Sequence, residues 1–181
     1  LRGGATDLTR GIILELRLPR AFGAFAVGAL LALAGALMQV LLGNPLADPY
    51  VLGVSGGAAV AALLALLLGL AGMPVTLAAF GGALTSMLLV FTLVRGGGPA
   101  RLLLTGVVIA AGWSAAVSLL LSIAPDASLR PMVFWLMGDL SQMTGSGFAF
   151  AALAGGLIVT LPFARDLNLL ARGELQAGAL G

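Results

Sequence analysis

Long uncharged apolar segments alternate along this chain with short polar breaks. No residue between Asp48 and Arg95 is charged, and this stretch is too long for one span because a bilayer core needs only about 20 helical residues. It divides at a turn rich in glycine and proline, residues 69–74. The pattern predicts five membrane-spanning helices, near residues 21–42, 51–70, 75–94, 102–124 and 147–164.

Polar segments flank and interrupt these spans. Residues 1–20 mix charged and apolar side chains, which predicts an interfacial segment with a short helix that stops at Pro19. Residues 125–146 form a polar connection with one short apolar piece. The tail, residues 165–181, is amphipathic, so it is either a surface helix on the bilayer or a helix that docks into a groove of another protein. Five spans place the two ends on opposite sides.

Composition sharpens this into a fold class. Of the 181 residues, 60% are hydrophobic and 9% are charged, whereas soluble domains carry about 25% charged residues. The chain therefore predicts an all-α, polytopic helical membrane protein. We expect residues 1–181 to be one transmembrane domain, and part of a longer polytopic protein, because the chain begins without methionine and ends directly after a polar segment.

Charge alone leaves the orientation open. Five arginines fall on the side of residues 1–20, and four fall on the other side. The positive-inside rule, by which cytoplasmic loops carry more Lys and Arg, therefore does not decide which side is cytoplasmic. If residues 1–20 are a specialised external surface, the count becomes one against four. That reading places the loop from Arg95 to Arg101, and the tail, in the cytoplasm.

The residue types that are missing exclude several chemistries. The chain has no histidine, lysine or cysteine. Residues 53–57 match the Gly-x-Ser-x-Gly pattern of a nucleophile elbow, but no base is available to activate Ser55, so the pattern predicts a tightly packed helix start. Without lysine there is no Walker-type nucleotide site, and the acids are too dispersed for a metal site. We expect no catalytic residue, metal or cofactor.

The run of residues 44–57 is the most informative break. Pro45 and Pro49 forbid a continuous helix there, and lipid does not tolerate the freed backbone groups. The break should therefore lie at a membrane surface or line a passage enclosed by protein.

Four polar side chains within the spans have two readings each. Gln39 shares a helix face with Gly28, Ala32 and Gly35, where it either supports helix packing or lines a translocation path. Ser114, Ser118 and Ser122 form a stripe at every fourth position. Their hydroxyls either bond preceding carbonyls of their own helix or line a substrate passage.

Two arginines, Arg17 and Arg20, precede the first span. They are either interfacial anchors that reach the headgroups or an electrostatic contact with acidic residues of a partner. The residues alone favour neither reading.

Four segments together resemble one transporter family. They are residues 17–20, the span end 35–39 with the run 44–58, the segment 134–138, and the tail 167–181. The Asn-Pro-Leu-Ala run that begins at Asn44 is the most specific of them. The chain resembles the permease subunits of ATP-binding-cassette importers for iron–siderophores, haem and cobalamin, the FecCD/BtuC-type family.

The resemblance implies a permease fold of roughly ten spans, of which this chain matches spans two to six. It implies that Arg17 and Arg20 dock a binding protein, and that Asn44 and Leu46 form a cytoplasmic gate. The implied ATPase-coupling residues are Leu169, Leu170, Gly173, Glu174, Leu180 and Gly181.

The resemblance also implies partners and a location. The partners are ATP-binding-cassette ATPase subunits, an extracytoplasmic substrate-binding protein and a second permease copy, identical or homologous; no nucleic acid is expected. The chain would lie in the bacterial cytoplasmic (inner) membrane as a multi-pass protein. It would not itself be an enzyme, because ATP hydrolysis falls to the separate ATPase subunits.

Iron–siderophore uptake is the expected function, with haem or cobalamin import as the alternative. An ion-coupled secondary transporter is the alternative from another class. Such transporters usually need intramembrane acids or histidines, and no predicted span here holds a charged residue, which argues against proton coupling.

Overall fold

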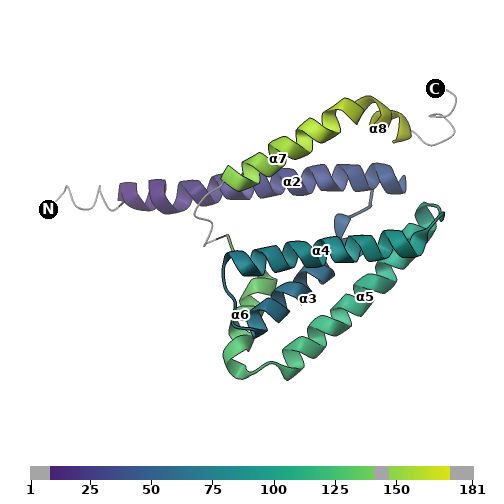
Figure 1. Ribbon diagram of the computed structural model, residues 1–181. Helices are drawn as coiled ribbons and strands as arrows, with labels where there is room; N and C mark the ends of the chain where they lie inside the picture. The colour runs from purple at the N-terminus through teal and green to yellow at the C-terminus, as the bar shows by residue number, and fades with distance from the viewer. Residues whose placement is uncertain (1–8, 141–146, 172–181) are drawn as a thin grey trace. The chain divides into compact units, whose positions relative to one another are not determined.

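The computed structural model describes residues 9–140 and 147–171, and within them every regular element is a helix (Figure 1). The elements in chain order are the π-helix η1 (Ile12–Arg17), α2 (Leu18–Leu42), the 3-10 helix η2 (Pro49–Leu52), α3 (Val54–Leu67), α4 (Met73–Val94), α5 (Pro99–Ile123), α6 (Asp126–Met137), α7 (Gly147–Thr160), the 3-10 helix η3 (Leu161–Phe163) and α8 (Ala164–Leu170). The predicted all-α class is confirmed.

All five predicted apolar segments are helical, but one is shorter than the others. Among the described residues, four continuous helical stretches are long and apolar enough to cross a membrane: Thr9–Leu42, Met73–Val94, Pro99–Ile123 and Gly147–Leu170. Helix α3 has 14 residues, or about 21 Å, against a hydrocarbon core of about 30 Å. The predicted second span loses its first turn because residues 49–52 form the separate 3-10 turn η2.

The predicted stop at Pro19 is wrong. Helical structure runs without a break from Thr9 to Leu42, and the turns just before the proline are π-helical, with the Leu18 N–H donating to the Ile13 carbonyl. A proline inside an α-helix clashes with the carbonyl four residues earlier. The wider π-turn gives the ring of Pro19 room, so the helix continues through it.

Helix α6 is an element that the sequence pattern did not predict. Residues 125–146 were predicted as a polar connection with one short apolar piece, and the helix that forms there contains Pro131. Its first turn carries Asp126, which suits the positive end of the helix dipole, and its buried residue is Met132. The exposed face of the helix holds Pro131, so the missing hydrogen bond does not interrupt the packed face.

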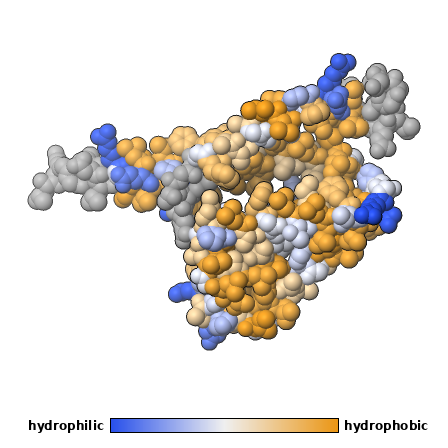
Figure 2. Space-filling view, viewed as in Figure 1, coloured by the Kyte–Doolittle hydropathy of each residue, from blue (hydrophilic) through white to orange (hydrophobic). Residues whose placement is uncertain are grey.

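The described residues fall into two compact units. The first, here the α3 unit, comprises Leu41–Gly138. In it α3 packs against α4, α5 and α6 (Figure 1), and five of its residues are buried: Gly57, Ala59, Ala62, Leu63 and Ala65. Met132 of α6 joins Leu63 and Leu120 in one apolar cluster. Figure 2 shows apolar residues over most of the visible face of this unit, with hydrophilic residues toward its two ends.

The second unit, here the α2 unit, comprises the described parts of Leu1–Val40 and Asp139–Gly181. Its two long helices meet through aromatic rings. The ring of Phe150 on α7 lies 6.4 Å from the rings of Phe22 and Phe25 on α2, edge-on to the first and stacked on the second. Beyond Thr160 the chain turns through η3, which contains Pro162, into the short helix α8.

Candidate functional site at the break before α3

The break begins with a turn that its own polar side chains hold together. After α2 ends, the Asn44 Oδ1 accepts the N–H of Leu46 at 2.9 Å, and the Asn44 carbonyl accepts the N–H of Ala47 at 3.0 Å. Asparagine favours this local bonding. Leu46 lies at the tip of the turn with 89% of its surface exposed, whereas Ala47 is buried, with 8% of its surface exposed. The turn therefore presents one large apolar side chain on a fixed backbone.

A helix cap at Asp48 links this turn to the start of α3. The Asp48 Oδ1 accepts the N–H of Tyr50 at 2.8 Å, which caps η2, and the Gly53 N–H then donates to the Tyr50 carbonyl. Gly53 has a φ of 68°, a left-handed conformation that glycine adopts without strain. Two hydrogen-bonded turns, Asn44–Ala47 and Asp48–Gly53, thus follow one another directly along the break.

Helix α3 then begins at Val54, with Ser55 in its first turn. An added Cβ on Gly56 would lie 2.6 Å from the Cβ of Trp113, and one on Gly57 would lie 2.5 Å from the carbonyl oxygen of Gly82. Only glycine fits at such distances. The Gly-x-Ser-x-Gly pattern is therefore a close-packing signature, as its sequence context predicted.

The break enters the interior of the α3 unit instead of staying at its end. Gly106 of α5 touches η2, since a Cβ there would meet the Val51 carbonyl at 2.6 Å, and a Cβ on Gly53 would meet the backbone of Ala110 at 3.1 Å. Counted from Pro99, these α5 positions lie roughly 10 to 17 Å along the helix. The α3 end of the break is therefore enclosed by protein, and a passage lined by the break stays a prediction.

Two side chains that the sequence analysis did not single out hold the break at this depth. Ser86 of α4 is fully buried, and its Oγ donates to the Gly53 carbonyl at 2.9 Å. The Nε1–H of Trp113 on α5 donates to the same Oγ at 2.8 Å. The sequence did show a polar side chain inside each of these two apolar spans. The hydrogen bond between Ser86 and Trp113, 27 positions apart, depends on the tertiary structure and could not be predicted from the sequence.

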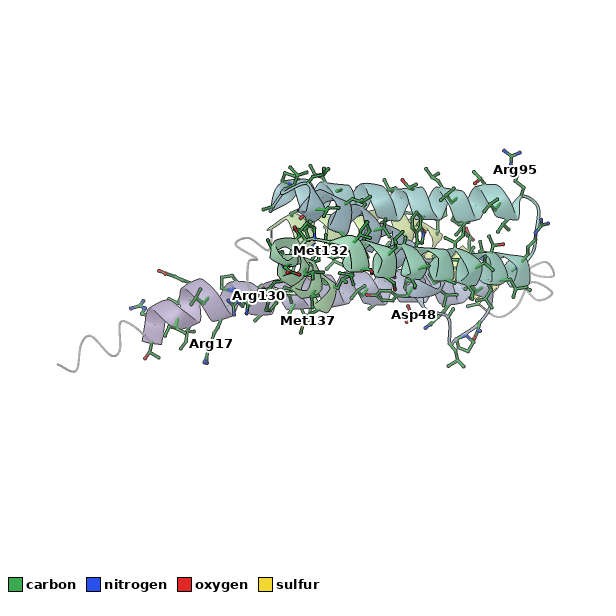
Figure 3. The ribbon with its side chains drawn as sticks, turned by 90° about the horizontal axis from the view of Figure 1, so that it is seen from below. Arg17, Asp48, Arg95, Arg130, Met132 and Met137 are labelled. Carbon is green, nitrogen blue, oxygen red and sulfur yellow. The ribbon has the colours of Figure 1, made fainter. Side chains whose placement is uncertain are left out.

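The ends of the α3 unit separate the charged loops as the alternation of spans requires. Helix η2 contacts both α4 and α5. Figure 3 shows Arg95 at one end of the unit and Arg130 toward the other, with Asp48 between them. Arg95 and Arg130 therefore lie toward opposite ends of the unit, as the alternation of spans predicts.

The predicted passage-lining residues lie on exposed surfaces of the described chain. Ser114 donates to the Ala110 carbonyl and Ser118 to the Ser114 carbonyl, both at 3.0 Å. These two hydroxyls are thus bonded within their own helix. Ser122 and Gln39 are exposed. Their role in a passage stays a prediction.

Arg17 and Arg20 lie on one continuous helix, three residues apart. Residues at this spacing are neighbours on a helix surface. Both are exposed, and Figure 3 shows the Arg17 side chain directed away from its helix. The pair therefore forms a ridge on a helix that continues through Pro19 instead of stopping there.

Part of the predicted coupling segment falls on α8. Leu169 is half-buried and Leu170 is 46% exposed. Gly173, Glu174, Leu180 and Gly181 lie outside the described residues.

Comparisons with known proteins bear on this arrangement. A sequence model described as the FecCD transport family matches residues 1–181. The chain is 38% identical, over 94% of its length, to the Fe(3+) dicitrate transport system permease protein FecD of Escherichia coli K12, and covers 54% of that protein. It is 40% identical, over 92% of its length, to the vitamin B12 import system permease protein BtuC of Serratia proteamaculans, and covers 52% of it.

A solved structure agrees with these sequence matches. A metal-chelate type ABC transporter in an inward-facing conformation matches with a TM-score of 0.80 and 31% identity, over 97% of this chain and 58% of the other. The chain spans about half the length of the curated relatives it matches.

The apolar helices and the enclosed polar break define a multi-pass, all-α membrane protein. Because the family match extends over every residue, the chain belongs to the FecCD transport family, as the resemblance of its four segments predicted.

Proposed function

We propose that this chain is part of the permease subunit of an ATP-binding-cassette importer, and that it lines the passage of an iron–siderophore-type substrate. The observation that carries the proposal is the family match along the whole chain, together with relatives named as permease proteins of an Fe(3+) dicitrate transport system and of a vitamin B12 import system. ATP hydrolysis would take place on separate ATPase subunits. The membrane would be the bacterial cytoplasmic (inner) membrane.

The geometry of the break supports a passage in particular. A polar, non-helical segment at bilayer depth is tolerated where protein or a water-filled cavity surrounds it. Here the segment carries Leu46 on a stiff turn. An exposed apolar side chain on a fixed backbone suits a narrow constriction, so we assign Asn44 and Leu46 to a cytoplasmic gate. In this assignment Asn44 shapes the turn and Leu46 closes the passage.

The partners follow from the same proposal. Arg17 and Arg20 would contact acidic residues of an extracytoplasmic substrate-binding protein. The segment from Leu169 to Gly181 would contact the ATPase subunits. A second permease copy, identical or homologous, would supply the other wall of the passage, in which Gln39, Ser114, Ser118 and Ser122 are the candidate polar positions.

Reconstitution tests the transport function. The full-length permease, its ATPase subunits and its binding protein are placed in liposomes, and uptake of a ferric siderophore is measured with and without ATP. We expect uptake that needs ATP and stops when the ATPase subunits are inactivated by mutation. Uptake driven by an ion gradient without ATP would instead establish the secondary transporter.

The substrate is decided in the same vesicles. Ferric dicitrate, another ferric siderophore, haem and cobalamin are offered separately and then in competition. We expect the ferric siderophores to be taken up, and exclusive uptake of haem or cobalamin would replace the iron assignment.

The gate assignment has its own test. Leu46→Ala should raise leakage of preloaded substrate from vesicles without ATP, because the apolar tip of the turn is removed. Leu68→Ala is the matched control, since Leu68 is 78% exposed but follows the other end of α3. Equal leakage from both variants would show that Leu46 does not close the passage.

A further inference from the structure

A buried polar network crosses the α3 unit at the depth where α3 begins. It consists of Ser86, Trp113 and the carbonyl of Gly53, joined by hydrogen bonds of 2.9 Å and 2.8 Å. Ser86 has no exposed surface. Each of the three groups comes from a different part of the fold, namely α4, α5 and the cap of α3.

The network satisfies a backbone group that the break sets free. The Gly53 carbonyl accepts the Gly57 N–H of the first turn of α3, and the Ser86 Oγ takes up its remaining capacity. At bilayer depth no water competes for such a group, so leaving it unpaired is costly. The Ser86 hydroxyl donates a hydrogen bond to the Gly53 carbonyl, and the Nε1–H of Trp113 donates one to the Ser86 Oγ. Every member of the network is therefore paired.

Close packing makes this network a fixed point for the break. Gly53 lies against Ala110, and Val51 and Leu52 lie against Gly106. Between Gly53 and Asn44 the backbone forms two hydrogen-bonded turns, Asp48–Gly53 and Asn44–Ala47, which join directly at the buried Ala47. A displacement at Gly53 is therefore transmitted to the turn that carries Leu46.

We propose that Ser86 and Trp113 are positioning residues that hold the Asn44–Leu46 turn in place through the carbonyl of Gly53. The consequence is mechanical. The turn moves together with α3, α4 and α5 as one body and does not open as an independent flap. The consequence for gating rests on the proposed transport function, whereas the positioning itself can be measured without transport.

Thiol labelling at Ala47 measures the position of the turn. Ala47 lies beside Leu46 and is 8% exposed, and the chain has no cysteine. The Ala47→Cys substitution is introduced into the full-length permease, assembled with its ATPase subunits in lipid nanodiscs, with any cysteines outside this chain replaced. The rate of modification by N-ethylmaleimide then reports the fraction of time that the turn is open.

Four further substitutions are compared on this background. We expect Ser86→Ala to raise the labelling rate roughly five- to tenfold, because it leaves the Gly53 carbonyl and the Trp113 N–H without their partner. Trp113→Phe should raise it by a smaller factor of about two to five, because Ser86 still donates to Gly53.

The two controls remove the same chemical groups elsewhere. Thr85→Val deletes the neighbouring hydroxyl of α4, which bonds the Gly81 carbonyl of its own helix, and Trp135→Phe alters the other tryptophan. Both should stay within about twofold of the background. A Ser86→Ala rate equal to that of Thr85→Val would overturn the proposal, as would an equal rise in all four variants.

The double variant tests whether the two side chains act as one network. If Trp113 acts through Ser86, adding Trp113→Phe to Ser86→Ala should change the rate little. A double variant that is faster by the full Trp113→Phe factor would show independent action and overturn the network. Failure of the wild-type complex to transport any metal chelate would remove the proposed function and leave the labelling result standing.

Discussion

The α3 unit and the α2 unit are both built from apolar helices, but different contacts hold them together. In the α3 unit small residues let backbones touch, as where Gly57 meets Gly82, and five residues of α3 are buried. In the α2 unit α7 has one buried residue, Ala149, and its partner helix is reached through the rings around Phe150.

This difference separates two tasks that membrane helices perform. Close backbone packing fixes geometry, because small residues replace the hydrophobic driving force that helices lack in lipid. It also encloses a polar network that would be costly against lipid. Contact through long side chains leaves most of α7 exposed in this chain, which suits a helix that meets lipid or other protein surfaces.

The largest expected effect concerns the anchor of α6 in the α3 unit. Met132 is fully buried between Leu63 and Leu120, so Met132→Ala should lower the free energy of unfolding by about 2–5 kcal/mol. Met137, at the end of the same helix, is 75% exposed and labelled with Met132 in Figure 3. Met137→Ala is the control, and thermal unfolding of the full-length protein in detergent is the measurement. Equal losses would mean that α6 is not anchored on α3.

The next effect concerns backbone contact between α3 and α4. A Cβ on Gly82 would overlap the Gly57 carbonyl and lie 2.6 Å from the Cβ of Ala61. Because backbone cannot yield as a side chain does, Gly82→Ala should cost about 1–3 kcal/mol. At Gly81 no atom lies within 4 Å, so Gly81→Ala should be neutral or slightly stabilising. Melting temperatures of the pair measure the difference, and indistinguishable values would contradict the close contact.

The corresponding test in the α2 unit should give a smaller loss than Met132→Ala. Phe150→Ala removes both ring contacts, each of which contributes about 0.5–1.5 kcal/mol. Phe148 on the same helix is 82% exposed, and Phe148→Ala is the control. A loss for Phe150→Ala as large as that for Met132→Ala would erase the contrast between the two units.

Much of the fold was predictable from the sequence, since the five apolar segments and the break at Pro45 and Pro49 follow from hydropathy and proline chemistry alone. The errors lie where local rules yield to neighbouring structure. Pro19 was expected to end a helix, but a π-turn accommodates it. Helix α6 was missed because its segment is polar with one short apolar piece, whereas its position is fixed by tertiary burial of Met132.

The candidate site divides in the same way. Asn44 and Leu46 were found from a local motif, and their turn geometry depends on residues within a few positions. Ser86 and Trp113 were not found, because their roles depend on partners 33 and 27 positions away. Serines are common in membrane helices, and two of the predicted stripe bond within their own helix. The periodicity of the sequence therefore revealed which residues share a helix face, but not which residues they bond in the folded protein.

The smallest expected effect concerns the exposed ridge that precedes the span of α2. If Arg17 and Arg20 contact acidic residues of a binding protein, charge reversal to glutamate should weaken that association. Exposed ion pairs contribute up to about 1 kcal/mol each, so the expected loss of affinity is about fivefold for each arginine at low salt. The loss should shrink as ionic strength rises above about 0.1 M, where the screening length falls below 10 Å.

The control for this ridge is Arg95→Glu. Arg95 lies at the end of α4, on the side assigned to the cytoplasm, so its reversal should leave the affinity for the binding protein unchanged. Titration of the binding protein onto the full-length permease in nanodiscs measures all three variants. Unchanged affinity for Arg17→Glu and Arg20→Glu would identify the ridge as a headgroup anchor, because an arginine that only reaches the interface contributes nothing to a protein partner. Weaker binding by Arg95→Glu alone would reverse the orientation assigned from the arginine count.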